Sequence, residues 1–399
     1  MEKKKSSFLR NETFLSVAAA IICILVGLLV GFLVLLAIKP EGAWAGILAI
    51  IKNFFNYPTK AAAMKYLGNT LVKTAPLLMC ALSINFCYKV GLFNIGAAGQ
   101  YVVGAAACLY AALAWNMPWY VCMILAMIAG GIFGLAVGFL KAYANVNEVI
   151  SGIMLNWIGL YLTNMILGNV KESTSPYTVN VKGSALIPSL GLSALFSNNK
   201  YVTIAVPLSI VFAILVWVVL EKTKFGYELR ATGYNKDAAK YAGMNEKKNI
   251  ILTLMIGGCL AGLGAAFLYL TGYEQWSTTQ SSVPGMGFNG IAATFLGGLS
   301  PIGTIFASFF IQHITSGGSY LDKSVYPSQI SDLISAIIIY LCGFVMFFKL
   351  VMNRRAAVRE EAKAEAAAQT PAGASVSAAA AADARQNADD GKEEGGKKE

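Results

Sequence analysis

Long apolar stretches recur along most of this sequence, separated by short polar or charged segments. Each apolar run is about 20 residues long, which is enough to cross a bilayer as an α-helix. The runs are continuous rather than alternating in hydrophobicity, so a membrane β-barrel is excluded. We therefore predict an all-α polytopic membrane protein with about eight to ten transmembrane helices.

The same pattern divides the chain into three parts. Residues 1–14 are a basic N-terminal segment, and residues 15–350 form the transmembrane domain. Residues 351–399 are rich in Ala, Glu and Gly, so we expect a cytoplasmic tail that is partly helical at first and otherwise disordered. The first apolar run is too long for a signal peptide and lacks a small-residue cleavage site, which predicts a retained helix. Basic residues beside the first and last runs place both termini in the cytoplasm.

Glycine-rich segments interrupt the apolar pattern in two places. Residues 91–100 carry three glycines and two amide side chains where hydrophobicity would otherwise continue. We predict a helix break there, because the freed backbone groups need partners in protein or in a water-filled cavity. Residues 297–301 split another apolar stretch into halves too short to span, which predicts a broken helix or a re-entrant hairpin. Phe93-Asn94-x-Gly96 in the first segment and Phe288-Asn289-Gly290 at the start of the second apolar stretch look alike, which indicates an inverted repeat around a midplane site unless the similarity is due to chance.

Two features inside the predicted helices concern packing. Gly130, Gly134 and Gly138 recur at intervals of four and give one helix a smooth face for a close neighbour. Lys73 is embedded in the predicted span 66–88. We expect its long side chain to reach the outer surface, because a lysine at the midplane is unfavourable by up to ~3 kcal/mol.

A charged segment of 28 residues, 221–248, separates two apolar runs and carries seven Lys or Arg residues, which predicts a cytoplasmic loop. Asn235 can cap a short helix within it, and Gly243 can supply a left-handed end. Asp237 then lies in the positive first turn of that helix. The helix would present a small apolar face for a partner, although an ordinary solvated loop is the alternative. That face is formed by Ala238, Tyr241 and Ala242.

The composition excludes several classes of protein. Of the 399 residues, 56% are hydrophobic and 13% are charged, and the formal net charge is +10. Because the basic residues cluster beside apolar runs, this charge sets membrane topology and does not indicate a nucleic-acid-binding protein. The seven cysteines form no C-x-x-C pair and there is one histidine, so we expect neither a metal site nor a disulfide framework.

The sequence also lacks the groups that would power transport or catalysis. No G-x-x-x-x-G-K-[ST] loop occurs, so the chain does not bind ATP by that route. No Ser/His/acid or Cys/His constellation can be assembled with the single histidine. The carboxylates near the predicted spans (Glu148, Asp322 and Asp332) lie at span ends, whereas an ion-driven carrier normally needs a midplane acid or an equivalent ion site. We therefore expect no enzyme activity and an energy source in another chain.

Three segments resemble a known family. Asp237-Ala238-Ala239-x-x-x-Gly243 resembles the E-A-A-x-x-x-G loop of bacterial ABC importer permeases, with Asp in place of Glu. Residues 94–100 resemble the signature N-I-G-A-E-G-Q, with Ala98 in place of the acid, and residues 147–156 resemble N-E-V-I-x-x-I-M-L-N. Both signatures belong to the nucleoside and simple-sugar branch of the branched-chain amino acid and simple sugar permeases. The resemblance extends over about residues 66–350.

This resemblance implies a permease subunit of an ATP-driven ABC importer that forms the translocation path for a nucleoside or simple sugar. It implies that the cytoplasmic loop docks on a separate ATP-binding subunit, which binds ATP and Mg²⁺, so that this chain needs no cofactor of its own. The implied coupling residues are Asp237, Ala238, Ala239, Tyr241 and Gly243.

The resemblance implies further partners as well. These are a second permease subunit, in a homo- or heterodimer, and an extracytoplasmic substrate-binding lipoprotein at a bacterial plasma membrane. Two alternatives stay open at this point: a permease for branched-chain amino acids, and a stand-alone secondary transporter or channel.

Four amide side chains are our candidates for the substrate path. Amide groups can both donate and accept hydrogen bonds without burying a charge, which suits a neutral polar solute. These residues lie in or near the glycine-rich breaks and the 147–156 segment, and they are Asn94, Gln100, Asn156 and Asn289.

Overall fold

The computed structural model describes residues 12–322, 324–326 and 328–368. Regular structure within these ranges is helical, and two isolated β-bridges pair Lys171 with Thr178 and Tyr177 with Ser277. The predicted all-α class is therefore confirmed. Residues 20–345 form one compact unit, and the described residues of the two chain ends belong to a second unit.

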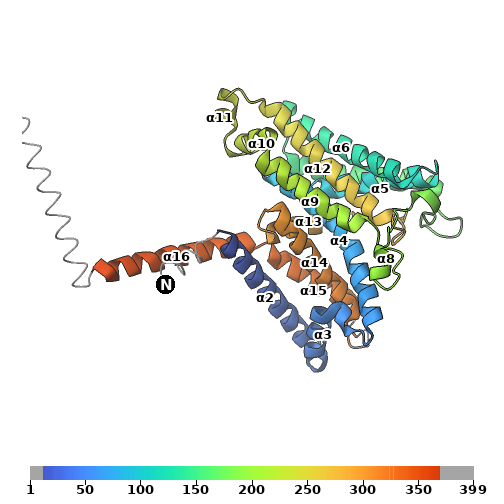
Figure 1. Ribbon diagram of the computed structural model, residues 1–399, viewed down its shortest axis with the longest axis horizontal. Coiled ribbons are helices and arrows are strands. Elements are labelled where there is room, and N and C mark those ends of the chain that lie inside the picture. The colour runs from blue at the N-terminus through green and yellow to red at the C-terminus, as the bar shows by residue number, and fades with distance from the viewer. Residues whose placement is uncertain (1–11, 323, 327, 369–399) are drawn as a thin grey trace, which may run out of the picture. The chain divides into compact units, whose positions relative to one another are not determined.

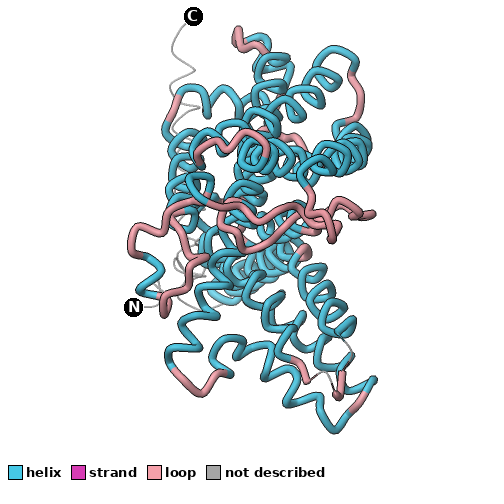
Figure 2. Tube along the Cα trace, turned by 90° about the vertical axis from the view of Figure 1, so that its right-hand side faces the viewer, coloured by secondary structure: helices cyan, strands magenta, loops and turns pink. Residues whose placement is uncertain are grey.

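The helices follow one another through short loops, except for two longer connections at residues 168–204 and 270–285 (Figures 1 and 2). In chain order the α-helices are α2 (Glu12–Ile38), α3 (Pro40–Lys52), α4 (Lys60–Tyr88), α5 (Ala97–Leu113), α6 (Trp119–Ala144), α7 (Glu148–Leu167), α8 (Leu192–Leu195), α9 (Ala205–Lys222), α10 (Lys224–Tyr234), α11 (Lys236–Tyr241), α12 (Glu246–Tyr269), α13 (Met286–Leu296), α14 (Pro301–Gly317), α15 (Ser328–Cys342) and α16 (Val345–Ala368).

Six helices among the described residues are long and apolar enough to cross a membrane. The 17-residue α5 and the 11-residue α13 are apolar but shorter. The expected eight to ten spans are therefore reached only if shorter apolar helices such as α5 and α13 are counted with the six long ones. The six long segments are Ala18–Ile38, Lys60–Tyr88, Trp119–Ala144, Glu148–Val170, Ala205–Lys222 and Glu246–Tyr269.

Helix α12 packs against α4, α5 and α6, and glycines allow the backbones to meet there. On α6, Gly130 and Gly134 lie directly against backbone oxygens of α12, so a Cβ at either would overlap them. A Cβ at Gly138 would lie 2.9 Å from the Cα of Ile251. The prediction that these glycines form a close packing face is confirmed.

Both predicted helix breaks are present. Helix α4 ends at Tyr88 and α5 begins at Ala97, and the residues between them form turns. Helices α13 and α14 are separated by residues 297–300, where a Cβ on Gly297 would lie 2.6 Å from the backbone nitrogen of Thr304. The glycines therefore permit the chain to reverse at close range.

The last apolar run, residues 328–350, is long enough for one span but does not form a single helix. It is divided between α15 and α16, with Gly343 and Phe344 in a turn between them. Gly is the least favourable helix former after Pro, which explains why the helix is interrupted there. Helix α16 continues to Ala368, so residues 351–368 of the expected tail are helical, whereas residues 1–11 and 369–399 lie outside the described residues.

The two ends of the main unit can be recognised by their contacts. At one end, Lys89 after α4 lies 3.9 Å from Glu221 of α9, close to α10 and α11. At the other, the Asn199 side chain, just after α8, donates to the Lys65 carbonyl oxygen at 2.8 Å. We call these the α11 end and the α8 end.

Candidate functional site

The break between α4 and α5 holds a pair of buried amides. Asn94 and Gln100 are 2% and 1% exposed. The Asn94 Nδ2 donates to the Gln100 Oε1 at 2.9 Å, and the Gln100 Nε2 donates back to the Asn94 Oδ1 at 3.1 Å. The Asn94 Nδ2 also donates to the Ser83 Oγ at 3.0 Å. This network joins the break to α4 on one side and to α5 on the other.

Asn156 of α7 completes the site from a third helix. Its Oδ1 accepts a hydrogen bond from the Gly99 N–H at 2.7 Å, and its Nδ2 donates to the Ile95 carbonyl oxygen at 3.1 Å. The first turn of a helix has N–H groups without intrahelical partners, so Asn156 caps α5 from a neighbouring helix. The structure thus brings three of the four predicted path residues to one place. In this conformation their amides are bonded to protein.

The fourth predicted residue, Asn289, is placed differently. It is half-buried on α13, and no hydrogen bond connects its amide to those of Asn94, Gln100 or Asn156. Helix α13 nevertheless packs onto the same break, because Gly287 lies directly against Ala98 in the first turn of α5.

The contact at Ala98 also bears on the family signature, which has an acid at this position. Gly287 leaves no room for a Cβ against the backbone and side chain of Ala98. A carboxylate at residue 98 would therefore meet the backbone of α13. The small residue at 98 and the glycine at 287 fit each other.

The contrast between Asn156 and Asn289 gives a prediction. Asn156→Ala would leave a buried N–H and a buried carbonyl unpaired, so we expect it to destabilise the protein by about 1–3 kcal/mol. Asn289→Ala should leave the thermal melting temperature of the purified protein unchanged, because its half-buried amide is outside the network. Equal melting temperatures for the two variants would show that the capping contact is not structural.

The charged loop forms the short helix α11 with both predicted ends. The Asn235 Oδ1 accepts from the Ala238 N–H at 3.0 Å. At the other end Gly243 has a φ of +81°. Its N–H donates to the Lys240 carbonyl at 3.0 Å, and the Met244 N–H donates to the Ala239 carbonyl at 3.0 Å. These are the two bonds of a Schellman helix end, which requires a left-handed residue. The predicted cap and the predicted end are confirmed.

The side chains of α11 divide into one anchor and an exposed face. Ala239 is 3% exposed and holds the helix against its neighbours, whereas Tyr241 is 93% exposed. Asp237, Ala238 and Ala242 are exposed as well. An aromatic ring in this position has almost no contact within the chain, so the face predicted for a partner is free in this structure.

Helix α10 connects α11 to the break between α4 and α5. A Cβ on Gly233 would lie 2.6 Å from the carbonyl carbon of Val90, so the two backbones are in direct contact. The buried Asn249 of α12 donates its Nδ2 to the Thr232 Oγ1 at 2.8 Å. The Arg230 Nη1 donates to the Glu221 Oε2 at 2.6 Å. A displacement of α11 therefore has a continuous set of contacts leading to the amide network.

Sequence reasoning missed a group of tyrosines at the α8 end. Lys73 does extend toward that end, where its Nζ lies 2.9 Å from the Glu274 Oε1. Around it the fold gathers Tyr57, Tyr66 and Tyr320. Their sequence positions give no signal of this proximity.

The sequence is similar to known proteins over most of its length. A sequence profile of the family described as branched-chain amino acid transport system / permease component matches residues 66–343. The guanosine ABC transporter permease protein NupP of Bacillus subtilis is 32% identical over 339 residues, which cover 84% of this chain and 95% of that protein. The nucleoside ABC transporter permease protein NupB of Lactococcus lactis is 30% identical over 88% of this chain and 96% of that protein.

A third similar protein is named as a glucose permease. The glucose ABC transporter permease protein TsgB13 of Haloferax volcanii is 29% identical over 71% of this chain and 77% of that protein. No solved structure matches the sequence.

Proposed function

This chain belongs to the branched-chain amino acid transport system permease family, and we propose that it forms the translocation path of an ATP-driven importer for a nucleoside. The observation that carries the choice of solute is the near full-length similarity to two permeases whose names specify guanosine and nucleosides. A simple sugar is the second candidate, favoured by the similarity to a glucose permease over most of the chain. The neutral amides at the helix break suit either solute, because neither carries a charge that needs a counter-ion.

The partners follow from the proposed function. The exposed face of α11 supports docking of a separate ATP-binding subunit, which would hold ATP and Mg²⁺. We further propose a second permease subunit and an extracytoplasmic binding lipoprotein that delivers the solute at the α8 end. In this proposal α11 and both chain termini face the bacterial cytoplasm. Basic residues cluster in the loop that contains α11 and beside the first and last apolar runs, as expected for the cytoplasmic side.

Coupling would use the contacts between α11 and the break. ATP binding closes the ATP-binding subunits around nucleotide and moves the docked α11. Helix α10 passes this movement to Val90 through the backbone of Gly233. The displacement reaches Asn94 four residues later, where the reciprocal amide pair can exchange protein partners for solute hydroxyl groups. The permease then alternates between a path open to the outside and a path open to the cytoplasm.

Uptake measurements test the proposed solute. Deletion of the gene should abolish uptake of radiolabelled guanosine and uridine by whole cells and leave glucose uptake unchanged. Loss of glucose uptake alone would support the sugar instead. Gradient-driven uptake into liposomes by the purified chain without partners would contradict the role as a subunit that depends on a separate ATPase.

The end of α11 provides a second prediction. A β-branched residue in the left-handed region is unfavourable by about 1–3 kcal/mol, so Gly243→Val should distort α11 and uncouple ATP hydrolysis from uptake. The matched control is Gly183→Val, since Gly183 also has a positive φ, of +65°, and open space around it, but lies in the 168–204 connection. ATPase activity and uptake of the reconstituted complex would be compared. Equal coupling ratios in the two variants would count against docking at α11.

A further inference from the structure

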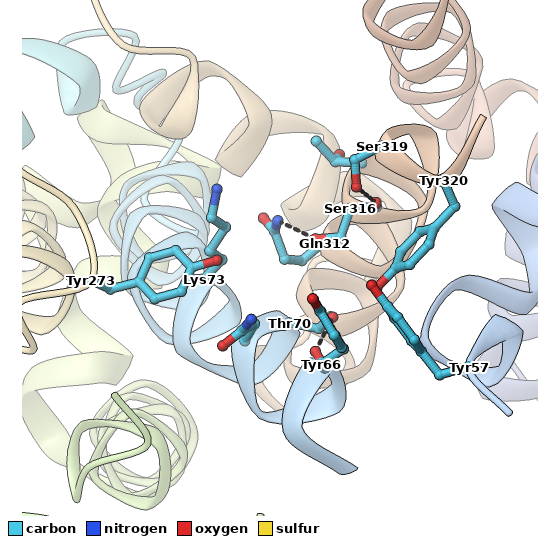
Figure 3. Close-up of a pocket in the computed structure, with 11 residues that line it drawn as sticks. Tyr57, Tyr66, Thr70, Lys73, Tyr273, Gln312, Ser316, Ser319 and Tyr320 are labelled. Atoms are coloured by element: carbon cyan, nitrogen blue, oxygen red, sulfur yellow. Dashed lines mark hydrogen bonds between the residues drawn. The ribbon is translucent and has the colours of Figure 1, made fainter. Parts of the chain in front are cut away.

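A cavity of about 290 Å³ opens at the α8 end, between the start of α4 and the end of α14 (Figure 3). Ligand pockets for small molecules begin at about 300 Å³, so this cavity lies at the lower end of that range and would hold one small solute at most. All of its lining residues belong to the main unit. It lies away from α11 and from the amide network described above.

Tyrosine rings form one wall of the cavity. Tyr57 and Tyr66 are stacked, with ring centroids 4.1 Å apart and an interplanar angle of 7°. Tyr320 meets Tyr57 edge to face at 5.6 Å. A phenol is neutral at physiological pH even at its usual pKa of about 10, and burial raises the pKa of the Tyr57 and Tyr320 hydroxyls further. The wall therefore offers flat aromatic surfaces together with neutral hydroxyl groups.

The other wall is polar but carries no net charge. Gln312 of α14 is only 6% exposed, and its Nε2 donates to the Ser316 Oγ at 3.1 Å. Figure 3 shows its side chain directed between the two helices, opposite Lys73. The Lys73 ammonium is paired with Glu274, so the one cation among the described lining residues is compensated. Such a lining favours a neutral ligand with several hydrogen-bonding groups.

A line of small polar residues continues from this pocket along α14. Thr304, Ser308, Gln312 and Ser316 recur at every fourth position and so share one face of the helix. The Asn85 Nδ2 on α4 donates to the Thr304 Oγ1 at 3.4 Å, which places that face against α4. The polar face thus forms a seam between α4 and α14.

Two oxygen atoms in this seam have no protein partner. The Asn85 Oδ1 and the Ser308 Oγ are completely buried, and neither forms a hydrogen bond within the described part of the chain. Leaving a buried polar atom unpaired is unfavourable by about 1–3 kcal/mol. These atoms would therefore gain a hydrogen-bond partner if the seam opened to water or to a solute.

We propose that the tyrosine-lined pocket binds the transported nucleoside on the outer side and that the α4–α14 seam is the polar start of its path. This inference rests on the proposed function. Aromatic stacking would hold the base, and Gln312 and the serine hydroxyls would bond to the ribose. A planar base can stack face to face on a tyrosine ring, so the tyrosine wall suits a nucleoside.

Kinetic measurements on whole cells test the pocket. Tyr66→Ala should raise the guanosine concentration for half-maximal uptake about two- to twelvefold, since an aromatic pair contributes about 0.5–1.5 kcal/mol beyond its buried area. Tyr66→Phe keeps the ring and should behave like the wild type. Tyr161→Ala is the matched control, because that side chain is 60% exposed on α7, away from the pocket. An unchanged half-saturation value for Tyr66→Ala overturns the proposal.

A labelling experiment is independent of the folding of Tyr66 variants. Ser319 is exposed at the rim of the pocket, whereas the described native cysteines are buried or half-buried. A membrane-impermeant thiol reagent added outside should modify Ser319→Cys, and guanosine, but not glucose, should slow the reaction. If the wild type takes up guanosine but Ser319→Cys is labelled at the same rate with and without guanosine, the proposal is overturned. Absence of guanosine uptake in the wild type would instead refute the proposed function.

Discussion

Replacing Tyr241 by Ala should detach the permease from its ATP-binding subunit and abolish ATP-driven uptake, while the permease itself stays folded. Tyr241 is 93% exposed, so truncation removes almost no internal packing. Buried tyrosines at protein interfaces often contribute 2 kcal/mol or more to binding, which corresponds to roughly 30-fold in affinity. The loss should therefore appear in association with the partner and not in stability.

Co-purification measures this effect directly. The ATP-binding subunit would be isolated through a tag, and the amount of permease retained would be compared between wild type, Tyr241→Ala and Tyr161→Ala. Tyr161 is an exposed tyrosine on another helix and serves as the control. The melting temperature of each purified permease should match the wild type. Full retention of Tyr241→Ala by the ATP-binding subunit would refute docking at this face.

Local features of this fold could be predicted from the sequence because each depends on few residues. The cap by Asn235 and the left-handed end at Gly243 involve atoms within one or two turns. The helix breaks follow from glycines and amides within short segments. The glycine face of α6 follows from the interval of four residues. These predictions needed no knowledge of the neighbouring helices.

The candidate path could be predicted only in part. Sequence reasoning selected Asn94, Gln100 and Asn156 as polar groups, but it could not show that Asn94 and Gln100 bond to each other or that Asn156 caps α5. Those contacts depend on how α4, α5 and α7 are packed. The amides are consequently elements of structure in this conformation, and their role in transport stays a prediction.

The pocket at the α8 end was beyond sequence reasoning altogether. Tyr66 and Tyr320 come from opposite parts of the chain and meet only after α14 has packed on α4. The polar face of α14 does have a helical period, yet the sequence suggested a broken or re-entrant segment there and gave no partner for it. Long-range packing decides which polar faces line a cavity, and periodicity within one helix does not reveal it.

The contact between α6 and α12 carries a large expected effect on stability. Ala is usually more favourable than Gly inside a helix, by about 1 kcal/mol. Gly134→Ala should nevertheless destabilise the protein, because the added Cβ would overlap the backbone carbonyl oxygen of Leu254, and backbone atoms cannot rotate away. Overpacking of this kind is unfavourable by about 1–3 kcal/mol and exceeds the gain in helix propensity. We therefore expect a lower melting temperature and less protein in the membrane.

Two other Gly→Ala substitutions test whether the overlap with the backbone, and not the replacement of glycine itself, causes the destabilisation. Gly131→Ala on the same helix meets first the Sγ of Cys259, at 2.6 Å, which is the end of a side chain that can rotate. Its destabilisation should be smaller than that of Gly134→Ala. Gly168→Ala, after α7, has no heavy atom within 4 Å of the new Cβ and should melt with the wild type. If Gly134→Ala melted at or above the wild-type temperature, the backbone contact of α6 with α12 would be absent in the membrane. Since α12 also packs on α4 and α5, loosening this contact should slow uptake even in the fraction of protein that folds.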